Sequence, residues 1–275
     1  MERHERVQPS KEKVIAVFTQ PSVTQRFTVP NHSTRNRRTH SRGAETMLVT
    51  GASSMHATWR PLFVDEHLLV VEKDAGLLTV PGRGEGKQDC LLSRLLDAGY
   101  DNVPYAAHRL DRDTSGIVAL GRTRAAHRSL SIQFQERQVI KRYEALVFGW
   151  LHADEGEVDE CIGKVLQAGD THQRMRILPR DADGARHSLT RWQVLDRSGQ
   201  DSIRWSRVSL SPITGRAHQL RLHMQHIGHP ILGDELHGTP IARESAERLC
   251  LHASQLQFRH PASDEMLTIQ SEAAF

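Results

Sequence analysis

The residues best suited to chemistry lie in one segment, His108–Gly116, with the sequence His-Arg-Leu-Asp-Arg-Asp-Thr-Ser-Gly. The apolar run 117–120 follows it and is bounded by Gly116 and Gly121, a pattern that predicts a short buried strand. A carboxylate placed at the start of such a rigid element and flanked by arginines can be held ionised and directed into a cleft. Asp111 is therefore the candidate reacting group.

The same segment is also good turn-forming sequence, because short polar side chains hydrogen-bond backbone N–H groups. Two more specific interpretations fail on spacing. An aspartic-protease loop carries Asp-Thr-Gly or Asp-Ser-Gly, whereas both Thr114 and Ser115 stand between Asp113 and Gly116. Asp111 and Asp113 have no third oxygen ligand nearby, so they do not indicate a magnesium site.

The complete segment, His-Arg-Leu-Asp-x-x-Thr-Ser-Gly, resembles the active-site signature of the RluA-type pseudouridine synthases at every fixed position. Lys141–Gly149 is similar to the second motif of that family, Lys-x-Tyr-x-Ala-x-Val-x-Gly, and Thr214–His223 resembles the third, Thr-Gly-Arg-x-His-Gln-Leu-Arg-x-His. The resemblance extends over about residues 61–275 and to the short form of the family, without an added RNA-binding domain. Two positions depart from the pattern, since Asp74 replaces a proline and His237 a frequent tyrosine.

The resemblance implies that the protein isomerises uridine to pseudouridine in structured RNA, with no cofactor and no metal. The N1–C1′ bond breaks, the uracil turns, and C5 joins C1′. Asp111 would act as the ionised carboxylate that attacks or stabilises the sugar or base. Tyr143 would stack on the uracil, and Arg221 would pair with Asp111 to keep it charged. Arg109 would occupy the space left when the uridine flips out, and the other expected substrate contacts are His108, Leu110, Thr114, Ser115, Gly116, Arg216, His218, Gln219 and Leu222.

The resemblance also implies an α+β fold, in which a mixed, mostly antiparallel central sheet is flanked by helices and loops around a catalytic cleft. Local patterns agree with this expectation. Residues 62–73 predict two strands joined by a turn, and residues 141–149 alternate like a strand. Ala126, Leu130 and Phe134 form a helical stripe after Thr123, a plausible N-cap.

Composition and charge place limits on the domain organisation. The chain has 275 residues, 38% hydrophobic and 25% charged, which is ordinary for a globular protein. Residues 1–58 carry nine Lys and Arg against four acids, and we expect them to be a basic, disordered extension of a catalytic domain at 59–275. A translation start at Met47 or Met55, or an arm that contacts RNA, are the alternatives for this extension. In the remainder, residues 122–143 form the most positive segment, either as a solvated helix face or as a contact surface for RNA phosphates.

The chain shows no signal for export or for a membrane. Its three cysteines form no Cys-x-x-Cys pair, it has no run of 18 apolar residues, and it lacks the apolar core of a signal peptide. These features predict a cytoplasmic protein that does not bind membranes, and we expect a monomer. The expected partner is RNA, either a ribosomal RNA loop, a tRNA anticodon stem-loop, or both.

Parts of the sequence also fit two other classes of function. The histidines between 218 and 229 could serve a zinc-dependent hydrolase, but only His223 and His226 have helical i, i+3 spacing, and no His-Glu-x-x-His motif occurs. A non-catalytic RNA-binding module is the other class. The joint presence of Asp111, Tyr143 and Arg221 argues against it.

Overall fold

A computed structural model describes residues 12–16, 58–82, 86–100, 105–166, 174–200 and 203–275. Only the backbone is described for residues 12–16 and 203. The strands are β1 Glu12–Ala16, β2 Trp59–Val64, β3 Leu68–Lys73, β4 Tyr105–Ala106, β5 Ser115–Gly121, β6 Ile140–Phe148, β7 Glu155–Val165, β8 Arg174–Leu178, β9 Arg186–Gln200, β10 Ile203–Pro212, β11 Leu251–Arg259 and β12 Met266–Gln270. The helices are α1 Leu91–Asp97, α2 Arg124–Gln135, α3 Gln219–His226 and α4 Pro240–Glu244.

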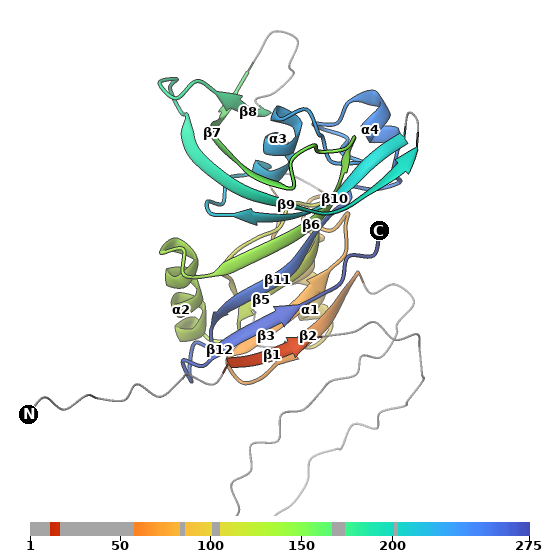
Figure 1. Cartoon of the computed structure of the whole chain (residues 1–275). Helices are drawn as coiled ribbons and strands as arrows, with labels where there is room; N and C mark the ends of the chain where they lie inside the picture. The colour runs from red at the N-terminus through yellow and green to blue at the C-terminus, as the bar shows by residue number, and fades with distance from the viewer. Residues whose placement is uncertain (1–11, 17–57, 83–85, 101–104, 167–173, 201–202) are drawn as a thin grey trace, which may run out of the picture.

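The strands of the described chain form one sheet of 12 strands, whose main path runs β2-β3-β5-β11-β6-β10-β9-β7-β8. Only the pairs β5–β11 and β1–β12 are parallel in it. Figure 1 shows α2 beside the half of the sheet that contains β3, β5 and β12, whereas α3 and α4 lie against the half formed by β7 to β10. The predicted α+β fold with a mixed, mostly antiparallel sheet is confirmed.

Strands β3 and β5 lie at the centre of the core because apolar layers cover both of their faces. Leu68, Val70, Ile117 and Ala119 belong to one buried cluster, and their neighbours Leu69, Val71, Val118 and Leu120 belong to another. Successive side chains of a strand point to opposite faces of the sheet. A strand that is buried on both faces therefore has a continuous run of apolar residues in its sequence. The strand predicted at 117–120 is therefore confirmed as the interior of β5.

Gly116 fixes the position at which the Asp111 segment enters the sheet. Its φ is +115°, and a Cβ atom there would lie 2.4 Å from the carbonyl oxygen of Ala253. Glycine is therefore needed both for the backbone conformation and for the close approach of β5 to β11. Ala253 pairs with Gly116 on one side and with Tyr143 of β6 on the other. This row of three residues brings the end of the Asp111 segment and Tyr143 to the same level of the sheet.

The N-terminal extension is described only at β1, which pairs in parallel with β12. The other residues of 1–57 lie outside the described residues. The domain boundary at 58/59 stays a prediction. Among the described residues, no helix is long and apolar enough to cross a membrane.

Candidate active site

A cavity of about 500 Å³ lies where the three motif segments meet. Asp111, Tyr143 and Arg221 all line it, although 110 residues separate the first from the last. The other predicted site residues that line it are His108, Arg109, Leu110, Thr114, Arg216, His218 and Gln219. Ser115, Gly116 and Leu222 do not line it. The buried Ser115 hydroxyl instead lies 2.9 Å from Nδ1 of His252.

The loop that carries Asp111 is held through its main chain on both sides of that residue. The Thr79 hydroxyl donates to the carbonyl of Leu110 (2.9 Å) and accepts from the Leu110 N–H (3.1 Å). The ammonium of Lys73, which is fully buried, donates to the carbonyl of Arg112 (3.0 Å) and to the carbonyls of residues 74 and 77. Burial lowers the pKa of Lys73 to about 8, although neighbouring carboxylates act to raise it. Sequence reasoning did not single out Thr79 or Lys73. The sequence feature that could have identified Lys73 is its position as a cation at the end of an apolar strand.

His108 lines the cavity and also supports the same loop from within. Its Nε2 accepts from the N–H of Ala119 (2.9 Å), and its ring stacks on Phe134 with centroids 4.3 Å apart. Burial, followed by the charge of Lys141, lowers the pKa of His108 to about 3. The ring is therefore neutral at physiological pH, with its proton on Nδ1.

The protein is expected to lose stability as the pH falls below about 6.5, the ordinary pKa of histidine. Burial also lowers the pKa values of His223 and His237 to about 4. Between these folded-state values and 6.5, the unfolded chain binds more protons than the folded one, so the free energy of unfolding decreases as the pH falls. Each histidine that is neutral in the folded state but protonated in the unfolded chain contributes at most about 1.4 kcal/mol per pH unit. Urea midpoints at pH 7.5 and 5.0 measure the effect, and His108→Gln should weaken the pH dependence. Equal midpoints at both pH values would contradict the assignment.

Arg221 is paired with a different carboxylate from the one expected. Its Nε and Nη2 donate to the two oxygens of Asp234 at 2.8 and 2.5 Å, and both side chains are almost completely buried. Asp234 also accepts from the N–H groups of Leu236 and His237. No hydrogen bond or ion pair between Arg221 and Asp111 occurs in the described structure, so the expected direct pairing is corrected. Burial acts to raise the pKa of Asp234, but the hydrogen bond and charge of Arg221 hold it below the ordinary value.

Asp111 nevertheless lies within electrostatic reach of two cavity residues. Burial, and then the charge of Asp111, raise the pKa of Tyr143 well above its ordinary value. Tyr143 is therefore a neutral phenol, which can stack on a base and donate a hydrogen bond. The charge of Asp111 also opposes the lowering of the pKa of His218 by burial. His218 adopts the left-handed conformation (φ +55°) just before α3, and its Nδ1 lies 2.8 Å from Nε2 of His237. His237, which stands where the family often has a tyrosine, thus contacts His218 in the cavity lining.

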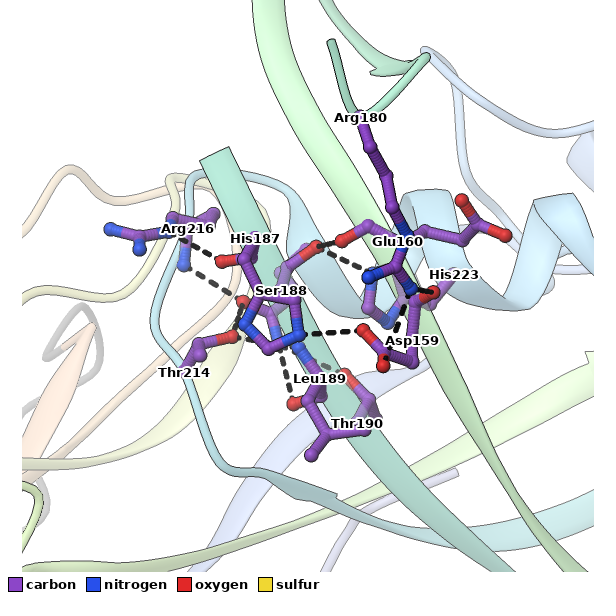
Figure 2. A network of polar contacts seen from close by, with 11 residues as sticks. Asp159, Glu160, Arg180, His187, Ser188, Leu189, Thr190, Thr214, Arg216 and His223 are labelled. Carbon is purple, nitrogen blue, oxygen red and sulfur yellow. Dashed lines mark hydrogen bonds and ion pairs between the residues drawn. The ribbon is translucent and has the colours of Figure 1, made fainter. Parts of the chain in front are cut away.

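Gln219 fixes the third motif segment against β9. Figure 2 shows Thr214, Arg216, Leu189 and Thr190, the four residues to which its side chain is hydrogen-bonded. Its side-chain oxygen accepts from the Thr214 hydroxyl (2.7 Å) and the Arg216 N–H (3.0 Å), and its amide donates to the Leu189 carbonyl and the Thr190 hydroxyl. Every polar atom of this buried amide has a partner. Gln219 is therefore a positioning residue that holds the loop 214–218 at the edge of the cavity.

The same network continues away from the cavity through β9. The guanidinium of Arg216 donates to the His187 carbonyl (3.2 Å), and the His187 ring lies 2.6 Å from the Asp159 carboxylate of β7. The hydroxyl of Ser188 donates to the Glu160 carbonyl and lies 2.9 Å from Nε2 of His223. The cavity edge, β7, β9 and α3 are therefore joined by one set of hydrogen bonds.

The histidines proposed for the alternative zinc site have separate partners. Ser188 contacts His223, and the Phe148 carbonyl contacts His229. Among the described residues, no group of three His, Cys, Asp or Glu side chains is arranged to hold a metal ion. The geometry therefore does not support a zinc-dependent hydrolase.

Comparison with known proteins identifies the family. Residues 67–226 match the RNA pseudouridylate synthase family. The chain is 41% identical over 211 residues to the dual-specificity RNA pseudouridine synthase RluA of Pasteurella multocida, covering 77% of this chain and 91% of the relative. It is 38% identical over 214 residues to RluA of Escherichia coli K12, covering 78% and 93%.

A solved structure agrees with these relatives. The human RNA pseudouridylate synthase domain containing 1 matches with a TM-score of 0.65 and 29% identity, covering 78% of this chain and 83% of the human one. These findings do not favour a hydrolase or a non-catalytic RNA-binding module. The chain belongs to the RluA-type RNA pseudouridine synthases and is an isomerase.

Proposed function

We propose that Asp111 is the catalytic carboxylate of this isomerase and that the cavity of about 500 Å³ accepts a uridine extruded from RNA. One observation carries the proposal: Asp111 is the only carboxylate among the described residues that line the cavity. Tyr143 lines the same cavity, and Thr79 and Lys73 hold the loop that carries Asp111. A fixed carboxylate beside an aromatic ring suits attack on a stacked nucleoside.

The reaction conserves all atoms of the nucleotide. The N1–C1′ bond breaks while Asp111 engages the sugar or the base as an ionised carboxylate. The uracil turns, a C5–C1′ bond forms, the proton leaves C5, and N1 gains a proton. Tyr143 holds the base as a neutral phenol. Arg221 acts through Asp234, because their ion pair anchors the start of α3 and with it the His218 side of the cavity.

The substrate that we propose is a uridine in a stem-loop of ribosomal RNA, tRNA or both. Extruding a base from a loop costs less than extruding it from a paired duplex, where about a few kcal/mol are needed. Arg109 is exposed and lines the cavity, which supports a role in filling the position that the uridine vacates. The curated relatives carry the name dual-specificity, which supports action on more than one RNA.

The three cysteines are free and buried, which supports a reducing compartment such as the cytoplasm, and we propose a monomer.

The test uses purified full-length protein and transcribed ribosomal RNA and tRNA that carry no modification. We expect pseudouridine at a small number of loop uridines when no cofactor is added, mapped at single-nucleotide resolution. Conversion only in long duplexes, or no conversion in either RNA class, would overturn the proposed substrate. RNA from a strain that lacks the gene should be modified at the same uridines.

A further inference from the structure

Two cations, Arg137 and Lys141, line the cavity together with Asp111. Burial, and then the charge of Arg137, lower the pKa of Lys141. Neither side chain makes a hydrogen bond or an ion pair with another part of the described chain. The nearest acid in sequence, Glu136, instead accepts from the amide of Gln138 at 2.7 Å.

Lys141 is partly buried and has no counterion among the residues that the structure describes. Its ammonium lies 3.8 Å from the position that a Cβ of Gly215 would occupy, so it reaches toward the third motif segment. Its neighbour His108 is neutral and supplies no negative charge. Removing a cation from water without a partner is unfavourable, and an anionic ligand would offset this cost.

Arg137 stands where the backbone favours glycine. It follows the C-cap of α2 with a φ of +61°, and the N–H groups of residues 137 and 138 donate to the carbonyls of Phe134 and Gln133. This is a Schellman ending, in which the left-handed position is usually glycine. Helices α1 and α3 end with the same hydrogen-bond pattern, and there Gly99 and Gly228 occupy the equivalent position. The arginine in α2 is thus unfavourable for the helix end, and strain of this kind is typical of functional positions.

We propose that Arg137 and Lys141 form a subsite for one phosphodiester group of the RNA strand that enters the cavity. A phosphate suits the pair, because a guanidinium can hold two of its oxygens while an ammonium supplies a compact charge. Contacts of this kind set the register of a nucleic acid without reading its sequence. The subsite would fix the backbone beside Asp111 and so prevent like-charge repulsion from expelling the strand. This inference rests on the proposed RNA substrate.

Arg137→Gly should make the protein more stable and weaken its binding of RNA. The melting temperature should rise by about 2 °C, because the left-handed strain is relieved. Affinity for an unmodified stem-loop should fall about five- to tenfold, and the slope of log affinity against log salt should decrease by about 0.7 to 1, as for one lost phosphate contact. Lys141→Gln should reduce the salt slope by a similar amount.

Two further variants control the experiment. Arg137→Asn also removes the charge and tolerates the left-handed conformation, so it should bind RNA as weakly as the glycine variant. Lys164→Gln removes an exposed charge of β7 that does not line the cavity, and it should change neither property. A more stable Arg137→Gly protein with unchanged affinity and salt slope would overturn the subsite. Failure of the proposed function is a separate result, since it would appear as an absence of pseudouridine with the unaltered protein.

Discussion

Asp111→Asn is expected to abolish isomerisation, with a loss of about 10³-fold or more in the single-turnover rate. Asparagine has nearly the same shape but carries no charge and is a poor nucleophile. The loop should keep its conformation, because Thr79 and Lys73 hold it through the main-chain groups of residues 110 and 112 and not through the carboxylate. RNA binding and melting temperature should therefore stay close to those of the unaltered protein.

Asp113→Asn is the matched control for this variant. Asp113 belongs to the same loop, pairs with the exposed Arg112 at 2.8 Å and does not line the cavity. An exposed ion pair of this kind contributes about 0–1 kcal/mol, so turnover and stability should change little. Full turnover by the Asp111 variant, or equal losses in both variants, would contradict the assignment of Asp111.

Asp234→Ala is expected to destabilise the protein by about 3–5 kcal/mol. The substitution would leave the guanidinium of Arg221 buried without its counterion and would also remove the acceptor of the Leu236 and His237 N–H groups. Chemical unfolding measures the loss. The His218–His237 contact, which depends on this turn, should be disturbed as well, so residual activity should be low even at temperatures where the protein is folded.

A double variant separates the ion pair from the rest of the turn. Arg221→Met with Asp234→Leu removes both charges, and such replacements are often neutral, so we expect it to regain part of the stability lost in Asp234→Ala. Glu235→Ala serves as the control, because Glu235 is exposed and its nearest cation, Arg243, is 3.8 Å away. An Asp234→Ala protein that unfolds within about 1 kcal/mol of the unaltered one would show that the buried pair is not required.

The sequence alone was sufficient for several local elements and for the family. The apolar run 117–120 between two glycines predicted β5, and the stripe of Ala126, Leu130 and Phe134 after Thr123 predicted α2. These predictions succeed because strand and helix periodicity and capping depend on neighbouring residues. The three motifs also identified Asp111, Tyr143 and Arg221, which line one cavity. The catalytic roles assigned to them remain predictions.

Only the tertiary structure decided which groups meet. Several carboxylates in the sequence could pair with Arg221. The path of the chain after α3 brings Asp234, and not Asp111, into an ion pair with it. The burial of Lys73 against the Asp111 loop, and the approach of Gly116 to Ala253, join segments that are 39 and 137 residues apart. Periodicity carries no information about such distant pairings, because they depend on how the whole sheet is assembled. The same holds for the unpaired cations Arg137 and Lys141, whose lack of counterions is visible only when all of their described neighbours are in place.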